Sequence, residues 1–115
     1  MKKWVLRFRQ VDKATFDAIA NGTKSIETRA ATPKYQKIHA GDILVFDCNK
    51  QRFEKHIKSV QHFPTIESML DTIPIQNIMP NVTSLEEAKQ TYYAFPDYEQ
   101  KIKDNGLLAF ELTSS

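Results

Sequence analysis

The feature that most constrains the fold is a short segment, Ile43-Leu44-Val45-Phe46, in which four consecutive residues are apolar. A strand with one solvent-facing side alternates apolar and polar residues, so a strand that is apolar throughout is buried on both faces. Asn49-Lys50 follows as a two-residue turn, and Arg52 to Phe63 then predicts a long strand. The chain is therefore expected to fold around a sheet in which residues 43–46 are central.

The residues before this segment predict a strand, a helix and a second strand. Residues 4–9 alternate in the way that is typical of a strand with one buried face. A helix is expected to begin at Asp12 as its N-cap, with Val11 and Phe16 forming a hydrophobic staple. Asn21-Gly22 supplies the residues that close a helix C-terminus, and a charged strand follows directly.

The second half of the chain is mainly helical in pattern. Short apolar stripes cover residues 66–70 and 75–79, and Ser84-Leu85-Glu86-Glu87 has the pattern of a capping box. A last strand is expected over Leu107 to Leu112. The order of strand, helix, three strands, helices and strand predicts an α+β fold whose short strands can curl into a small barrel. A chain of 115 residues fits a single domain, 1–115.

Charge is divided unevenly along the chain. Residues 1–62 carry 13 Lys and Arg against 6 Asp and Glu, whereas residues 63–115 carry 3 against 8. If the two halves form different faces, one face is basic and suited to phosphates, as on RNA. A solvated surface whose sign varies by chance is the alternative.

Several classes of site are disfavoured. The single cysteine, Cys48, excludes an intramolecular disulfide and a cysteine metal site, and the three histidines lack the spacing of a zinc site. We expect no metal and no cofactor. No stretch approaches the roughly 20 apolar residues of a membrane span, and the N-terminus lacks a signal-peptide core. We therefore expect a cytoplasmic protein that does not associate with membranes and shows no obligate protein partner.

Three charges fall within six residues in the charged strand, at Lys24, Glu27 and Arg29. Arginine offers a planar fork for a phosphate or carboxylate, and lysine a mobile point charge. Glu27 can hold both cations, accept hydrogen bonds from a base or sugar, or activate a water. The alternative is a surface ion pair between Glu27 and Arg29, worth about 0.2–1 kcal/mol and without function.

Aromatic side chains are candidates for stacking on an unpaired base. Tyr35 lies between two lysines, and Tyr98 lies outside the apolar stripe that carries Tyr92 and Phe95. We therefore count Tyr35 and Tyr98 as ligand-binding candidates and assign Tyr92 and Phe95 to the core.

Two ordered motifs resemble those of the ASCH domain family. Gly22-Thr23-Lys24-Ser25-Ile26-Glu27-Thr28-Arg29 resembles its G-x-K-x-I-E-x-R signature, and Gly41-Asp42-Ile43-Leu44-Val45-Phe46 resembles the strand that follows it. Segments near residues 78–81, 84–88 and 106–112 match the remainder in the right order. The whole chain is most similar to the small stand-alone members from bacteria and archaea.

The resemblance implies a PUA-like β-barrel of about five or six strands with flanking α-helices, and a polar cleft beside residues 24–29. Related domains bind RNA, so the resemblance implies RNA or a modified nucleoside as the partner. One group in the family removes the acetyl group of N4-acetylcytidine with a lysine, a threonine three residues later and a distant glutamate. Lys24 matches that lysine, Glu27 stands at the threonine position, and Asn81 falls near the glutamate position.

Two hypotheses follow. In the first, the chain is a binding module in which Lys24, Glu27, Arg29, Tyr35 and Tyr98 contact RNA or a nucleoside. In the second, it is an amidohydrolase acting on N4-acetylcytidine or a related acylated nucleoside, with Lys24 and Glu27 as the catalytic pair. Burial and the charge of Arg29 would both lower the pKa of Lys24 and favour its neutral amine.

Overall fold

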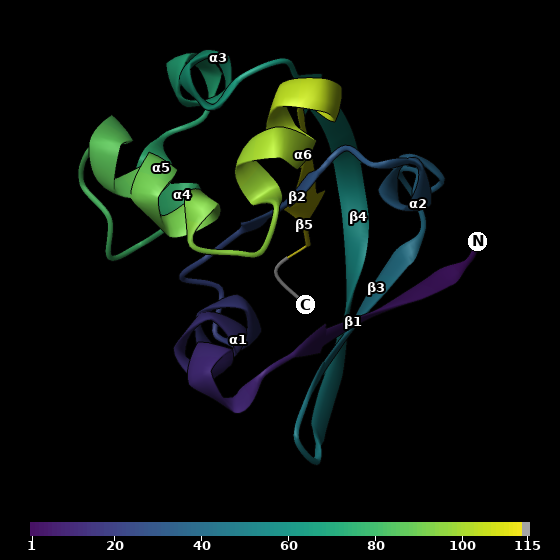
Figure 1. The fold of residues 1–115 in the computed structure, drawn as a ribbon. Helices are drawn as coiled ribbons and strands as arrows, with labels where there is room; N and C mark the ends of the chain where they lie inside the picture. Colours follow the sequence, from purple (N-terminus) through teal and green to yellow (C-terminus); the bar gives the residue numbers. More distant parts are fainter. Residues whose placement is uncertain (114–115) are drawn as a thin grey trace.

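One curled sheet organises the molecule, and its strands lie in the order β1-β3-β4-β5-β2 (Figure 1). We describe residues 1–113 of a computed structural model. The strands are β1 (Lys3–Phe8), β2 (Ile26–Ala30), β3 (Ile43–Cys48), β4 (Gln51–Phe63) and β5 (Leu107–Leu112). The helical elements are η1 (Gln10–Asp12), α1 (Lys13–Ala20), α2 (Pro33–Gln36), α3 (Ile66–Thr72), α4 (Ile75–Ile78), α5 (Leu85–Tyr93) and α6 (Tyr98–Asn105).

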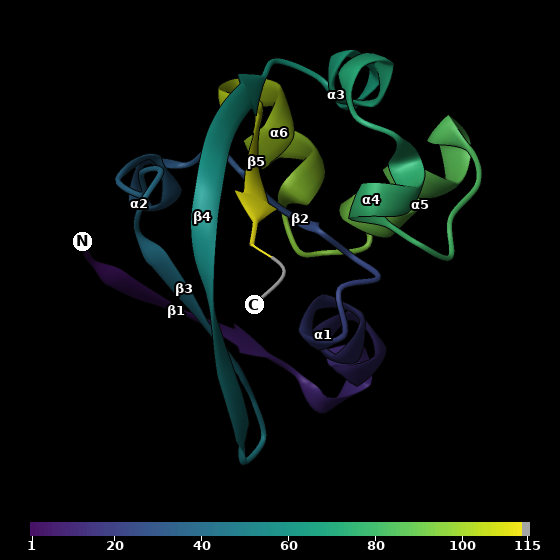
Figure 2. The same ribbon diagram turned by 180° about the vertical axis from the view of Figure 1, so that it is seen from behind.

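The long strand β4 joins the two halves of the sheet. Its first half pairs antiparallel with β3, with Phe53 opposite Phe46, and its second half pairs antiparallel with β5. The register shifts between Ile57 and Ser59, where the strand passes from one partner to the other. Such irregularities increase local twist and bend, and Figures 1 and 2 show β4 curving through the molecule. The result is a five-stranded half-barrel over residues 1–113, within an α+β fold.

Two apolar clusters form the core between the curved sheet and the helices. The first lies under α1, where the ring of Phe16 packs against Phe8 and Phe53. The second lies between β5, β2 and the helices α3 to α6, and it includes Ile66, Met69 and the ring of Tyr92. Figure 1 shows α1 below and the C-terminal helices above, on the same side of the sheet. The cavity described below is lined by residues of both groups.

The α+β fold and the PUA-like half-barrel are confirmed. Residues 43–46 form a strand that is buried at each position and is flanked by β1 and β4, as predicted. The turn after β3 and the long strand β4 are also present. Among residues 1–113, no helix is both long and apolar enough to cross a membrane.

The predicted start of the first helix is wrong in its details. Val11 is 80% exposed, so it forms no staple with Phe16. Asp12 occupies the N-cap position, but its carboxylate makes no capping hydrogen bond and instead accepts one from Arg9. The reason is the short helix η1, which places Val11 inside a 3₁₀ turn that faces solvent. The charged strand also begins later than predicted, because Lys24 precedes β2.

Candidate functional site

The strand β2 lies at one end of the sheet, so only its side toward β5 carries ladder hydrogen bonds. On the other side of the strand, side chains form hydrogen bonds with a backbone group of every second residue. Lys24 donates to the carbonyl of Ile26 at 2.6 Å, Thr28 N–H donates to the Glu27 carboxylate at 3.1 Å, and Ala30 N–H donates to the Tyr98 hydroxyl at 3.3 Å. The candidate site is therefore built along the free edge of β2.

Lys24 is placed by the end of α1. Gly22 adopts a positive φ of 86°, and the Lys24 N–H then donates to the carbonyl of Ala18 at 3.0 Å. The side chain is 5% exposed, and its Nζ also donates to the carbonyl of Ile78 at 2.5 Å. Lys24 thus ties the start of β2 to the end of α4.

Glu27 lies between two cations. Its Oε1 is 3.6 Å from Lys24 Nζ, and its Oε2 accepts a hydrogen bond from Arg29 Nη2 at 3.1 Å. Glu27 is 5% exposed, so the predicted alternative of a surface ion pair is wrong. The ion pair exists, but it is buried and has Lys24 as a third member.

Burial and charge act in opposite directions on these groups. Burial lowers the pKa of Lys24, and this effect outweighs the opposing influence of the Glu27 carboxylate. Burial alone would raise the pKa of Glu27, but Arg29 and Lys24 together lower it. Burial alone would lower the pKa of Arg29, but the attraction to Glu27, Tyr35 and Tyr98 and the hydrogen bond to Glu27 together raise it. Glu27 is therefore a carboxylate at neutral pH.

Arg29 is held between aromatic rings. Its guanidinium carbon lies 5.6 Å from the ring centre of Phe8 and 5.7 Å from that of Tyr35. Tyr35 therefore supports Arg29, and it lies outside the lining of the cavity described below. Stacking of Tyr35 on a ligand, as predicted from sequence, stays a prediction that this position does not favour.

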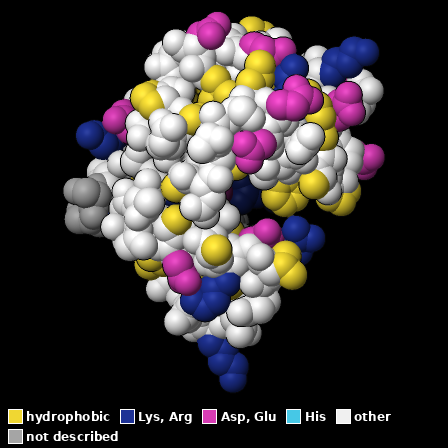
Figure 3. Space-filling view, turned by 90° about the vertical axis from the view of Figure 1, so that its left-hand side faces the viewer, with side chains coloured by type: hydrophobic (Ala, Val, Ile, Leu, Met, Phe, Trp, Pro, Cys, Tyr) yellow, Lys and Arg dark blue, Asp and Glu magenta, His cyan; other side chains and the backbone are white. Residues whose placement is uncertain are grey.

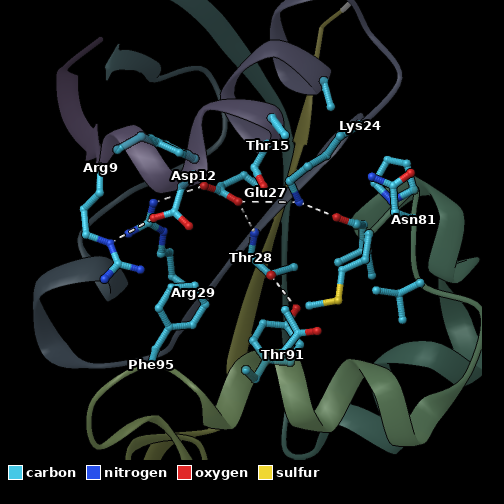
Figure 4. A pocket seen from close by; sticks show the side chains of 18 of the residues that line it. Arg9, Asp12, Thr15, Lys24, Glu27, Thr28, Arg29, Asn81, Thr91 and Phe95 are labelled. Carbon is cyan, nitrogen blue, oxygen red and sulfur yellow. Dashed lines mark hydrogen bonds and ion pairs between the residues drawn. The ribbon is translucent and has the colours of Figure 1, made fainter. Parts of the chain in front are cut away.

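A cavity of about 410 Å³ opens beside these residues. Four segments line it, within residues 7–18, 24–29, 78–82 and 91–98. Figure 3 shows the hollow in space-filling form, with basic side-chain atoms at its floor. Figure 4 shows Lys24, Glu27 and Thr28 in the middle of the site, with Arg9 and Asp12 on one side and Asn81 on the other. Side chains from both faces of β2 reach the cavity, because it runs along the strand's edge.

Thr28 and Tyr92 form a buried pair on the cavity wall. Their hydroxyl groups are 2.5 Å apart, and burial raises the pKa of Tyr92. Tyr98 also lines the cavity and stacks on Tyr92 with ring centres 6.5 Å apart. The Tyr98 hydroxyl is engaged by Ala30, so its ring is the part that remains available to a ligand.

Sequence reasoning missed several lining residues. Thr28 was not among the residues that the sequence singled out as site candidates, and Phe95 was expected in the core. Arg9 and Asp12 were noticed only as local features, although both line the cavity. Arg9 crosses to the other wall, where its guanidinium carbon lies 5.8 Å from the ring centre of Phe95. Nothing in the spacing of Arg9 and Phe95 indicates this contact, because 86 positions separate them.

In the part of the chain that the structure describes, histidine, cysteine and carboxylate groups do not converge on a metal position. Within residues 1–113, no cluster of three or more such residues could hold a metal ion. The cavity instead presents two carboxylates, four cations, hydroxyl groups and aromatic rings. These are groups that bind a polar organic ligand.

Comparison with known proteins places this geometry in a family. The family model of the ASCH domain matches residues 10–113. The chain belongs to the ASCH domain family. This ASCH domain is similar to the crystal structure of hypothetical protein PH0355, with 29% sequence identity, a TM-score of 0.82 and coverage of 97% of both chains.

A second solved structure gives the same result. The solution NMR structure of protein PF0455 from Pyrococcus furiosus shares 28% identity with this ASCH domain, with a TM-score of 0.76, over 96% of this chain and 94% of that one. A search of curated proteins found no match. The family and the fold are thus shown, and membership associates the domain with nucleic acid in a general way.

Proposed function

We propose that this ASCH domain binds RNA or a nucleoside in the cavity along β2. The observation that supports this most directly is the buried chain of Lys24, Glu27 and Arg29 beside a cavity of about 410 Å³. Ligand pockets of about 300–1,000 Å³ are typical for small organic molecules. This volume suits a single unpaired nucleoside, either free or turned out of an RNA strand.

The chemistry of the lining supports the same ligand. The Glu27 carboxylate accepts hydrogen bonds, which suits a base amino group or ribose hydroxyls. Arg29 keeps N–H groups beyond those that Glu27 and the Tyr35 hydroxyl engage, so it can also contact a base edge or phosphate. The rings of Phe95 and Tyr98 line the cavity and offer apolar faces to a base.

Titration of short single-stranded RNAs tests this proposal. Fluorescence anisotropy at low salt should detect binding that weakens steeply as salt is added, because phosphate contacts release counterions. Replacing both cations, by Lys24→Ala with Arg29→Ala, should abolish it. Arg52→Gln is the control, because Arg52 pairs with Asp47 outside the cavity.

Since Lys24 and Arg29 also support the fold, a second measurement keeps the test decisive. Nucleosides titrated into the unchanged protein should shift the NMR signals of Thr28 and Phe95 and leave those of the β3–β4 turn in place. Absence of RNA binding at low salt, together with unshifted cavity signals, would overturn the proposal.

Hydrolysis of N4-acetylcytidine is a second candidate, favoured by the lowered pKa of Lys24 beside a carboxylate. In this reaction Glu27 takes a proton from water, the oxygen attacks the acetyl carbonyl, and the bond from that carbon to N4 breaks. Acetate and cytidine leave, and N4 receives the proton. Chromatography of N4-acetylcytidine incubated with pure protein measures the reaction. No turnover, or full turnover by Glu27→Gln, would exclude this role.

A further inference from the structure

Positive charge exceeds negative charge inside the cavity. Its lining includes four cations, Arg7, Arg9, Lys24 and Arg29, against two carboxylates, Asp12 and Glu27. Arg7 is 77% exposed and pairs with Asp47, which lies outside the lining, so one positive charge remains in excess, and an uncharged nucleoside would leave it unbalanced. The lining therefore favours an anionic ligand.

The arginines gather at one end of the site. Figure 4 shows Arg9, Arg29 and Phe95 on the side away from Asn81. At the opposite end the lining residues are Met79, Pro80, Asn81 and Val82, which carry no charge. A ligand that matches both ends has an anionic group at one end and a neutral group at the other, as a nucleotide does.

Arg9 is oriented so that part of its guanidinium is available. Its Nε donates to Asp12 Oδ2 at 3.0 Å, which leaves both terminal nitrogens without a protein partner among the described residues. Phe95 supports the guanidinium from the opposite wall. A guanidinium fixed by one carboxylate and one ring is preorganised for a two-pronged contact with phosphate.

Arg29 repeats this arrangement deeper in the site. Glu27 engages Nη2, and the rings of Phe8 and Tyr35 flank the guanidinium. The Arg29 side chain is 21% exposed and that of Arg9 is 65% exposed, so both reach the cavity with different access to solvent. Two arginines that are each held by a carboxylate and an aromatic ring thus line the same cavity.

We propose that Arg9 and Arg29 form a subsite for a phosphomonoester, so that the cavity takes a nucleoside monophosphate rather than an uncharged nucleoside. This inference rests on the proposed function and specifies its ligand. A phosphomonoester carries a charge of about −1.5 to −2 at pH 7 and three acceptor oxygens, which suits two guanidinium groups at one end of the cavity better than the single negative charge of an internal phosphodiester. The phosphate belongs either to a free nucleotide or to the end of an RNA.

Isothermal titration calorimetry with two sets of ligands tests the subsite. One set contains adenosine, cytidine, guanosine and uridine, and the other contains their 5′- and 3′-monophosphates. For at least one base, the monophosphate should bind at least about tenfold more tightly than the nucleoside at pH 7.5, as expected for charge-assisted hydrogen bonds. This preference should diminish below about pH 6, where phosphomonoesters take up a proton.

Matched variants separate the subsite from general electrostatics. Arg9→Gln should lower the ratio of the two affinities severalfold, because it removes one of the two guanidinium groups of the subsite. Arg52→Gln removes the same charge outside the cavity, on an arginine whose side chain is 55% exposed, and should leave the ratio unchanged. An equal effect of both variants would overturn the subsite.

The remaining outcomes distinguish the two proposals. If nucleosides bind as tightly as their monophosphates, the phosphate subsite fails while nucleoside binding stands. If neither nucleosides, monophosphates nor short RNAs bind, both proposals fail. If the monophosphates are preferred, a further titration identifies whether the phosphate comes from a free nucleotide or from the end of an RNA. It uses hexanucleotides that carry a 5′-phosphate, a 3′-phosphate or no terminal phosphate. Tighter binding of a phosphorylated hexanucleotide assigns the subsite to RNA ends, and weaker binding of all three than of free nucleotides assigns it to nucleotides.

Discussion

Replacement of the central carboxylate, Glu27→Gln, tests whether the buried ion chain stabilises the fold. The substitution keeps the side-chain shape but removes the negative charge between Lys24 and Arg29. Removal of one partner from a buried ion pair costs about 3–5 kcal/mol, because the remaining charge stays buried without compensation. We expect the lower end, about 3 kcal/mol, since a glutamine oxygen can still accept a hydrogen bond and Arg29 is partly exposed.

The effect should depend on pH with a definite sign. The pKa of Glu27 is lowered in the folded protein, so its ionised form contributes stability above the pKa of an unfolded glutamate, about 4.3. This contribution is lost as the pH falls through the lower, folded-state pKa. The difference between the unchanged protein and Glu27→Gln should therefore be largest at neutral pH and shrink in acid.

Urea unfolding at pH 7 and at several values below pH 4 measures both effects. Glu54→Gln is the matched control, because Glu54 pairs with Lys3 at 3.0 Å on the surface, where its side chain is 44% exposed. Exposed pairs contribute about 0–1 kcal/mol. Equal stability losses for the two variants at pH 7, or a loss for Glu27→Gln that does not change with pH, would refute the reasoning.

Three further predictions concern other parts of the structure. Thr28→Val and Tyr92→Phe should each cost about 1–2 kcal/mol in urea unfolding, because each leaves one buried hydroxyl unpaired, and the double variant should cost less than their sum. Gly106→Ala should cost about 3 kcal/mol, because φ is +78° and an added Cβ would lie 2.4 Å from a backbone oxygen, whereas Gly22→Ala should cost about 1 kcal/mol, since nothing lies within 4 Å. Asp42→Asn should reduce the loss of stability between about pH 4 and pH 2, because hydrogen bonds lower the Asp42 pKa to about 2; the midpoint of urea unfolding should then fall less steeply with pH in this range.

The sequence was informative where a local pattern decides the outcome. The apolar run at residues 43–46 has only one stable environment, between two other strands, and it lies there. The density of charge over Lys24, Glu27 and Arg29 also identified residues that come together in the structure. In both cases neighbours in sequence carry the information.

The rest of the cavity depends on contacts between distant segments. Tyr92 and Phe95 share one apolar stripe and both line the cavity, yet Tyr92 is 3% exposed and belongs to the second apolar cluster, whereas Phe95 is only half-buried. The difference arises where α5 ends, since Phe95 follows the helix in the turn toward α6. Helical periodicity cannot describe a residue beyond the helix end. Val11 was misplaced for a similar reason, because the 3₁₀ turn has a different period.

The free edge of β2 links ligand binding to the integrity of the strand. An uncovered strand edge is a template for pairing with another chain, and here Lys24, Glu27 and Tyr98 occupy the backbone groups that such a chain would use. A substitution at any of them leaves a buried backbone group of β2 without its partner. Loss of binding in such a variant can therefore arise from a disturbed strand, and size-exclusion chromatography belongs beside each binding measurement. The same side chains that form the site also satisfy the outer backbone groups of β2, and the helices α4 and α6 cover the strand.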